Sequence, residues 1–118
     1  MVSKILILII AFLHFYILIL EMFLWDTPRG MKTFRNSPDK AQLTKSLAQN
    51  MGLYNGFLAA GLLWAALSTS ELQTSLAYFF LGCVLVAGIY GSVTASRKIF
   101  FIQAIPALIA LIAVFFHI

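Results

Sequence analysis

Charge and cysteine are scarce in this sequence. Only 10% of its 118 residues are charged, whereas a soluble domain typically carries about 25%. Hydrophobic residues reach 62%, and a small water-soluble fold leaves too much of its surface exposed to hide them. The single cysteine, Cys83, excludes an intrachain disulfide and a thiolate metal cluster. The apolar excess must face lipid, which predicts an integral membrane protein.

Several functional signatures are also missing. The sequence has no nucleophile–base pair, no glycine loop that would cradle phosphate and no paired carboxylates. Its net charge is +4, but the cations flank apolar segments and no aromatic–basic platform for nucleic acid accompanies them. We therefore expect no nucleic-acid partner and no cofactor, assign no catalytic residues, and favour a non-enzymatic role.

Four apolar segments are long enough to be membrane helices, which need about 20 residues to cross the hydrocarbon core. They are residues 5–25, 51–67, 76–95 and 99–118. The first is too long for the core of a signal peptide and no small-residue cleavage site follows it, so we predict a retained helix. The predicted fold class is all-α: a polytopic bundle of four transmembrane helices in a single domain, 1–118.

The connections add detail to this prediction. Ser37-Pro38-Asp39 is typical of a helix start, with a serine cap, proline in the first turn and an acid near the positive end of the dipole. From Pro38 the helix is expected to run unbroken to Leu67, about 45 Å. Its polar beginning belongs to a basic loop, 26–50. Trp25–Gly30 is predicted to be a turn, Ser68–Thr74 a short loop and Ser96–Lys98 a tight hairpin.

The cations predict an orientation. The first loop carries five of them and the third loop two, whereas the opposite side has only Lys4; the seven are Arg29, Lys32, Arg35, Lys40, Lys45, Arg97 and Lys98. Because cationic loops stay in the cytoplasm, both termini are predicted to face outward, with the long basic loop in the cytosol.

Polar side chains inside the spans are costly and need a partner or a purpose. The candidates are His14, Glu21, Asn55, Tyr90, Thr94 and Gln103. In the predicted topology each helix places one polar group about 6–8 Å inside its cytosolic end. This common depth predicts a polar pocket that is centred on Glu21, opens to the cytosol and binds a proton or a cation.

Two alternatives to the pocket stay open. The polar groups can form an interhelical hydrogen-bond layer, with each bond worth roughly 0.6–2 kcal/mol. Glu21 can also reach out to the interface and meet Arg29 or Lys32. His14, seven residues before Glu21 and on the same helix face, either extends a proton path or simply packs. Its spacing from Glu21 is not a zinc motif, and no metal site is expected.

Small residues recur at four-residue spacing in two spans, as in helices that pack closely. They are Gly52, Gly56 and Ala60 in the second span and Ala87, Gly91 and Ala95 in the third. Pro106 is predicted to kink the fourth span and to free the carbonyl of Ile102, since proline has no N–H to donate.

The whole chain resembles a family of small bacterial membrane proteins known as domain of unknown function 1304. The matching stretches are Glu21–Gly30, Asn50–Gly61, Ala87–Gly91 and Gln103–Ala107. The resemblance implies a four-helix inner-membrane protein and brings no established reaction.

Three functions therefore compete. The first is binding or transport of a cation, proton or lipophilic small molecule at Glu21, by a homo-oligomer because 118 residues are too few to enclose a wide pathway. The second is a membrane enzyme acting on a lipid or thiol conjugate, for which Arg29 and the basic loop offer an anion site. The third is a structural or regulatory membrane subunit in which the polar layer only fixes packing. The lipid bilayer is the partner that all three share.

Overall fold

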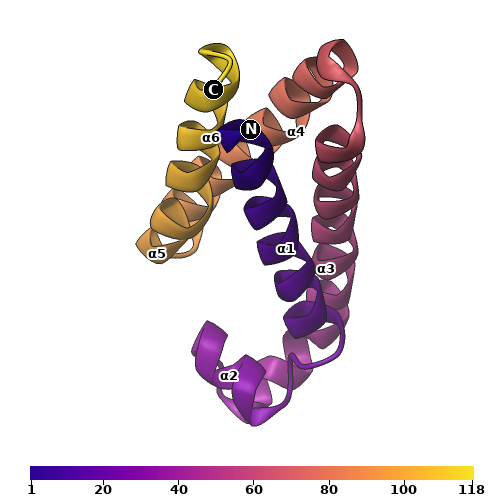
Figure 1. The fold of residues 1–118 in the computed structure, drawn as a ribbon. Helices are drawn as coiled ribbons and strands as arrows, with labels where there is room; N and C mark the ends of the chain where they lie inside the picture. The colour runs from indigo at the N-terminus through magenta and orange to yellow at the C-terminus, as the bar shows by residue number, and fades with distance from the viewer. The chain divides into compact units, whose positions relative to one another are not determined.

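The protein is built from helices. The computed structural model describes residues 1–118, with the exception of the side chain of Ser70. The elements follow in the order α1 (Val2–Met22), α2 (Pro28–Phe34), α3 (Pro38–Leu67), α4 (Ser70–Thr94), α5 (Arg97–Ile99), the π-helix η1 (Phe100–Ala104) and α6 (Ile105–Phe115) (Figure 1). The predicted all-α class is confirmed.

Three helical runs are long and apolar enough to cross a membrane: Val2–Met22, Glu71–Thr94 and Arg97–Phe115. Within the described part of the chain, α3 is not among them, because its first turns are polar and Asn55 interrupts its apolar half. The three runs fit a helical membrane protein, while the predicted count of four spans is not confirmed by this criterion.

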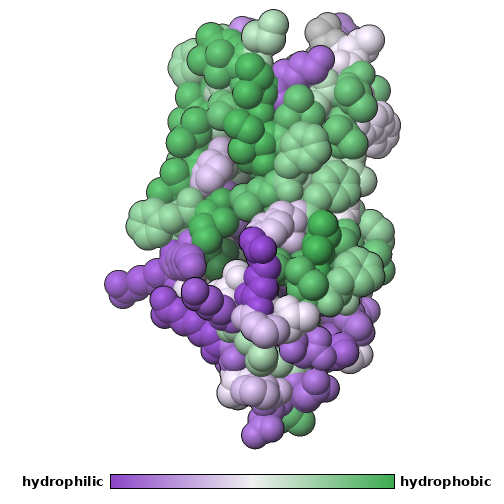
Figure 2. All heavy atoms as spheres, turned by 60° about the horizontal axis from the view of Figure 1, so that its bottom comes forward, coloured by the Kyte–Doolittle hydropathy of each residue, from purple (hydrophilic) through white to green (hydrophobic). Residues whose placement is uncertain are grey.

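Large apolar side chains lie on the outer surface of the helices. Phe12, Phe79 and Val86 are 62%, 65% and 66% exposed. Hydrophobic residues cover much of the face drawn in Figure 2. Such a surface would be unfavourable in water and is the ordinary lipid-facing surface of a membrane helix.

The start of α3 is where the sequence predicts it. The helix begins at Pro38, and the backbone N–H of Lys40 donates to Ser37 Oγ at 3.2 Å. Asp39 lies in the first turn, and the helix runs without interruption to Leu67. The predicted continuous helix from Pro38 to Leu67 is confirmed.

Two connections differ from the prediction. The basic loop contains a further helix, α2, whose cap Thr27 accepts a hydrogen bond from the N–H of Gly30 at 3.3 Å. The predicted turn therefore lies between Met22 and Pro28 instead of reaching Gly30. Helix α4 begins at Ser70, ahead of the predicted start at residue 76, so the preceding loop is shorter than expected.

The chain forms two compact units. We call Met1–Phe12 with Leu58–Ile118 the terminal unit and Leu13–Phe57 the central unit. The terminal unit has one buried apolar cluster, to which α1, α3, α4 and α6 all contribute; its members are Ile7, Ile10, Ala11, Leu62, Ala65, Ala66, Ala77, Leu81, Val84, Ala107, Ala110 and Val114. Many of these residues are alanines, which allow the helices of this unit to pack closely.

The last helical run of the terminal unit changes its hydrogen bonding ahead of Pro106. The N–H of Ile105 donates to the carbonyl of Phe100, five residues back, and the π-helix η1 spans Phe100–Ala104. Because Pro106 has no N–H, the ordinary bond to Ile102 cannot form there. The hydrogen bonding changes to that of a π-helix here, while the predicted kink stays a prediction.

Candidate functional site

The central unit brings two of the predicted site residues into contact. Glu21 lies in the last turn of α1 and is only 3% exposed. The side-chain amide of Asn55, on α3, donates to Glu21 Oε1 over 2.6 Å. The two residues are 34 positions apart in the sequence, so the pair exists only because α1 and α3 pack together here.

Glycines on α3 make this close approach geometrically feasible. A Cβ added at Gly52 would lie 2.6 Å from Met22 Cγ and 3.0 Å from Glu21 Cβ. One turn later, a Cβ at Gly56 would lie 2.5 Å from the Leu18 side chain. Asn55 follows Gly52 by three residues and so projects from a neighbouring part of the same face. The missing side chains let α3 come near enough for Asn55 to reach the acid.

The partner of Glu21 is neutral. Among the described residues the recorded ion pair joins Lys45 to Asp26, and no cation contacts Glu21. Arg29 does not turn toward Glu21: its Nε donates to the hydroxyl of Tyr16 at 3.0 Å. The hypothesis that Glu21 reaches out to meet Arg29 is therefore wrong, and among the described residues Glu21 forms no ion pair with Lys32 either. What remains is a buried carboxyl group whose charge a proton or a small cation could balance.

His14 lies on the same helix as Glu21. Its side chain is fully buried, with 0% exposure, and it precedes Glu21 by seven residues, about two helical turns. The central unit thus contains two buried titratable side chains on one face of α1. Their use as a proton path stays a prediction.

Tyr90, Thr94 and Gln103 belong to the terminal unit. Tyr90 is 71% exposed, and the hydroxyl of Thr94 donates to the backbone carbonyl of Tyr90 at 2.8 Å within α4. Gln103 is half-buried in η1, where the helix geometry changes. Their convergence on Glu21 stays a prediction of the sequence.

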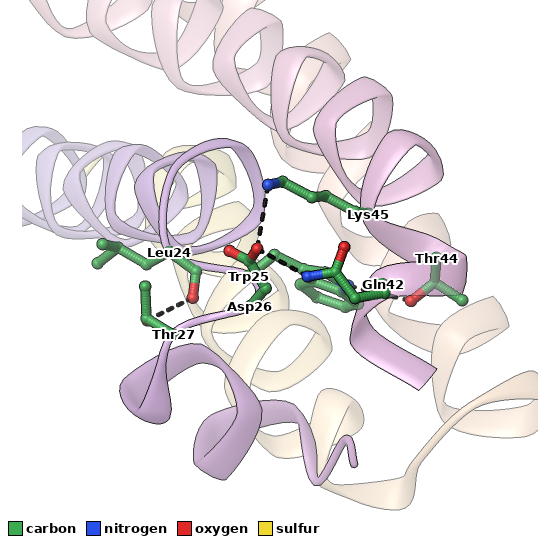
Figure 3. A network of polar contacts seen from close by, with 7 residues as sticks. All are labelled: Leu24, Trp25, Asp26, Thr27, Gln42, Thr44 and Lys45. Atoms are coloured by element: carbon green, nitrogen blue, oxygen red, sulfur yellow. Dashed lines mark hydrogen bonds and ion pairs between the residues drawn. The ribbon is translucent and has the colours of Figure 1, made fainter. Parts of the chain in front are cut away.

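A network of polar contacts in the central unit was not predicted (Figure 3). Lys45 Nζ donates to Asp26 Oδ2 at 3.0 Å, and Gln42 Nε2 donates to the same oxygen at 3.2 Å. Nearby, Trp25 Nε1 donates to the hydroxyl of Thr44 at 3.0 Å. The turn after α1 is thereby tied to the first turns of α3.

The hydrogen bond from Lys45 holds the pKa of the Asp26 carboxyl below its ordinary value, and the bond from Gln42 acts in the same direction. The sequence contains a signal for the pair of Asp26 and Lys45, because Asp26 directly follows a predicted span and begins a loop with five cations. Spacing alone does not say which cation it meets.

No group of three or more His, Cys, Asp or Glu side chains in the described part of the chain is arranged to hold a metal ion. The chemistry available at the site is therefore that of one carboxyl group with a carboxamide neighbour.

Fold and site together define a small helical membrane protein that carries a buried acid in its first apolar helix. Over residues 8–115 the chain matches the family described as "Protein of unknown function (DUF1304)", and it belongs to that family. It is 32% identical over 111 residues to the "Uncharacterized protein YpaA" of Lactococcus lactis subsp. lactis (strain IL1403), covering 92% of both chains. No solved structure matches it. The resemblance noted in the sequence is confirmed.

Proposed function

We propose that this protein is a multi-pass protein of the cytoplasmic membrane that binds a proton or a small cation, including a lipophilic one, at Glu21 and transports it. One observation supports the proposal above others: a carboxyl group that is 3% exposed, on an apolar helix, has a neutral amide as its partner. An intramembrane acid is costly unless something balances its charge. A group that must take up a proton or cation to be stable is well suited to carry one.

Four crossings are the topology that we propose. The N–H of Ser3, in the first turn of α1, donates to the carbonyl of Ile118 at 3.1 Å, so the beginning of α1 and the end of α6 lie at the same end of the terminal unit. Ser3, Gln73 and His117 also line one hollow, which brings the start of α4 to that end. If the start of α1 and the end of α6 lie on the same side of the membrane, the chain must cross it an even number of times. The three apolar runs make three crossings, and we propose that α3 makes the fourth.

The apolar half of α3 supports the same topology. Leu62, Ala65 and Ala66 are fully buried in the cluster that α1, α4 and α6 also enter. The cations of the α1–α3 connection and of Arg97–Lys98 would then share the cytosolic side, with both termini outside. A homo-oligomer is part of the proposal, because one copy of 118 residues is too small to surround a pathway.

The test uses Glu21→Gln in liposomes. Glutamine keeps the size of the side chain and an oxygen that accepts from Asn55, but it cannot exchange a proton. With a pH-sensitive dye inside the vesicles and a proton or monovalent cation gradient imposed, the wild-type protein should dissipate the gradient. The variant should slow this flux by about tenfold or more, the scale of a lost essential group.

Glu71→Gln is the matched control, since Glu71 is an exposed acid in the first turn of α4. It should transport like the wild-type protein. Wild-type flux in the Glu21→Gln vesicles would rule the proposal out.

The structural hypothesis rests on an observation of its own. Gly52 and Gly56 place α3 tightly against α1, so the bond between Asn55 and Glu21 can act as interhelical glue. Under this hypothesis Glu21→Gln preserves both stability and every cellular function of the protein. Loss of flux with an unchanged thermal unfolding temperature favours transport instead.

A further inference from the structure

Helix α3 presents a row of side chains on the outside of the central unit. We call this row the outer stripe; its members, all exposed, are Leu43, Leu47, Asn50, Tyr54 and Phe57. Leu43 is 86% exposed and Leu47 is 63% exposed. Successive members are alternately four and three residues apart, which is the spacing of the contact seam in a two-stranded coiled coil. The outer stripe thus has the pattern of a helix that packs along a second helix.

The other side of α3 already packs against this chain. Ala41 and Ala48 are buried there, and Lys45, on the same side, donates to Asp26 at 3.0 Å. The 3.6-residue repeat of the helix puts these positions roughly opposite the outer stripe. The outer stripe is therefore a second face of α3, and it stays exposed in a single copy of the protein.

Lipid cannot cover the beginning of the outer stripe. Leu43 and Leu47 are the large apolar residues of the stretch 38–50, whose other members are polar, alanine or the initial proline. Leu43 precedes Met51, where the apolar half begins, by eight residues, which is about 12 Å along the helix axis. Because α3 is unbroken, its first turns continue the axis of the proposed span and leave the hydrocarbon. Two exposed leucines in line outside the lipid indicate a protein partner.

We propose that this partner is a second copy of the chain, with the two α3 helices packed in parallel along their outer stripes. Copies with the same topology hold each residue of α3 at the same depth, so a twofold axis along the membrane normal brings every member of the stripe to its counterpart. Leucine then meets leucine and ring meets ring, and no like charges are opposed, because the stripe carries no charged residue. The interface rests on the proposed four-crossing topology and gives the proposed homo-oligomer its contact surface.

Asn50 favours a second copy over a lipid chain as the occupant. Its carboxamide donates one N–H to the carbonyl of Ser46 at 2.9 Å, and among the described residues no partner is recorded for its oxygen. The second N–H and the oxygen are therefore available to the same residue of the second copy. An asparagine in the seam of a parallel pair favours two strands in one register. A lipid chain offers neither a donor nor an acceptor.

The test places single cysteines in a Cys83→Ser background and oxidises native membranes, so that a disulfide forms only where two copies bring the same position together. Leu43→Cys and Leu47→Cys should give disulfide-linked dimers on a non-reducing gel. Gln49→Cys is the matched control, because Gln49 is exposed and lies about 3 Å from Leu47 along the axis but off the stripe. It should cross-link at least about fivefold more slowly. Equal rates at Leu47→Cys and Gln49→Cys, or no dimer at either position, would overturn the interface.

A charge on the stripe gives a second measurement. Leu47→Lys opposes two cations in the seam, so it should raise the dimer dissociation constant in detergent at least about tenfold, measured by analytical ultracentrifugation. Gln49→Lys carries the same charge off the stripe and should leave the constant within about twofold of the wild-type value. Because Leu47 is exposed in a single copy, both variants should keep the helical content of the wild-type protein. Equal dissociation constants for the two variants would contradict the proposal.

These outcomes are separable from those of the transport experiment. Glu21→Gln should leave the cross-linking of Leu47→Cys unchanged, because Asn55 meets Glu21 on the side of α3 away from the stripe. If Glu21→Gln abolishes flux while Leu47→Cys and Gln49→Cys cross-link equally, the interface fails and transport stands. If the dimer forms and Glu21→Gln leaves the flux intact, transport fails and the interface stands.

Discussion

A carboxyl group in an apolar helix is stable only where its surroundings supply a proton, a cation or hydrogen-bond donors. Among the described side chains, the amide of Asn55 donates to Glu21, and this donor is neutral. The pair lowers the cost of burial without removing the need for a balancing charge. Asn55 therefore acts as a positioning residue in the proposal, because it orients the carboxyl group without exchanging protons itself.

Asp26 provides a prediction on pH. The bond from Lys45 lowers the pKa of Asp26 in the folded protein, so the folded state favours the ionised form. The stability that this gives is present above the ordinary aspartate pKa and is lost as the pH falls through the lower, folded-state pKa. Thermal unfolding in detergent, followed from about pH 6 to about pH 3, should show this loss as a falling midpoint.

Asp26→Asn should flatten that part of the pH profile, because an amide keeps the shape and cannot titrate. Asp39→Asn is the control, since Asp39 makes no recorded ion pair in the described part of the chain. An unaltered acid profile in Asp26→Asn would mean that the contact with Lys45 does not contribute to stability.

At the scale of the helices, close approach depends on a few glycines. Gly88 of α4 faces η1, and a Cβ placed there would lie 2.6 Å from the backbone nitrogen of Ala104 and 2.9 Å from its Cα. Backbone atoms cannot rotate away as a side chain does. Gly88 therefore permits the packing of α4 against η1.

We predict that Gly88→Ala lowers the free energy of unfolding by about 1–3 kcal/mol, the usual effect of overpacking. Gly82→Ala on the same helix is the matched control, because nothing lies within 4 Å of a Cβ added there. That variant should be neutral, or more stable by up to about 1 kcal/mol through helix propensity. The measurement is thermal or denaturant unfolding in detergent, and equal effects at the two positions would contradict the packing argument.

Local and tertiary interactions differ in how well the sequence predicts the helices that depend on them. The start of α3 follows from Ser37 and Pro38, whose effects are local, and the structure has it at that residue. Helix α2 has only seven residues, and the ring of Phe34 lies 4.7 Å from that of Trp25. So short a helix depends on such contacts, which no local pattern reveals.

For the molecule as a whole, topology is the property to test. In a Cys83→Ser background, single cysteines at Thr69 and Ser96 are exposed reporters on successive loops. With four crossings, an impermeant maleimide added to intact cells should label Thr69→Cys and should reach Ser96→Cys only after the membrane is opened. A third single cysteine, at Ser3 in the first turn of α1, reports the side of the N-terminus and should be labelled in intact cells like Thr69→Cys. If α3 did not cross while Ser3→Cys was still labelled from outside, the pattern at the two loops would be reversed.

The candidate site was predicted only in part. Glu21 and Asn55 could be recognised because polar residues in apolar helices are rare enough to be conspicuous. The contact of Arg29 with Tyr16 could not be recognised, because it joins residues 13 positions apart across a turn. The pairing of Asp26 with Lys45 was not predicted either, because five nearby cations were equally plausible partners.

The sequence by itself determined that the chain is helical and belongs in a membrane, because lipid requires long apolar segments whose backbone polar groups bond internally. It also determined where α3 begins, through a local cap. Only the tertiary structure decided that Asn55 meets Glu21 and that Arg29 turns to Tyr16. Such contacts depend on which helix faces come together, and packing between distant segments is not encoded in any single stretch of the chain.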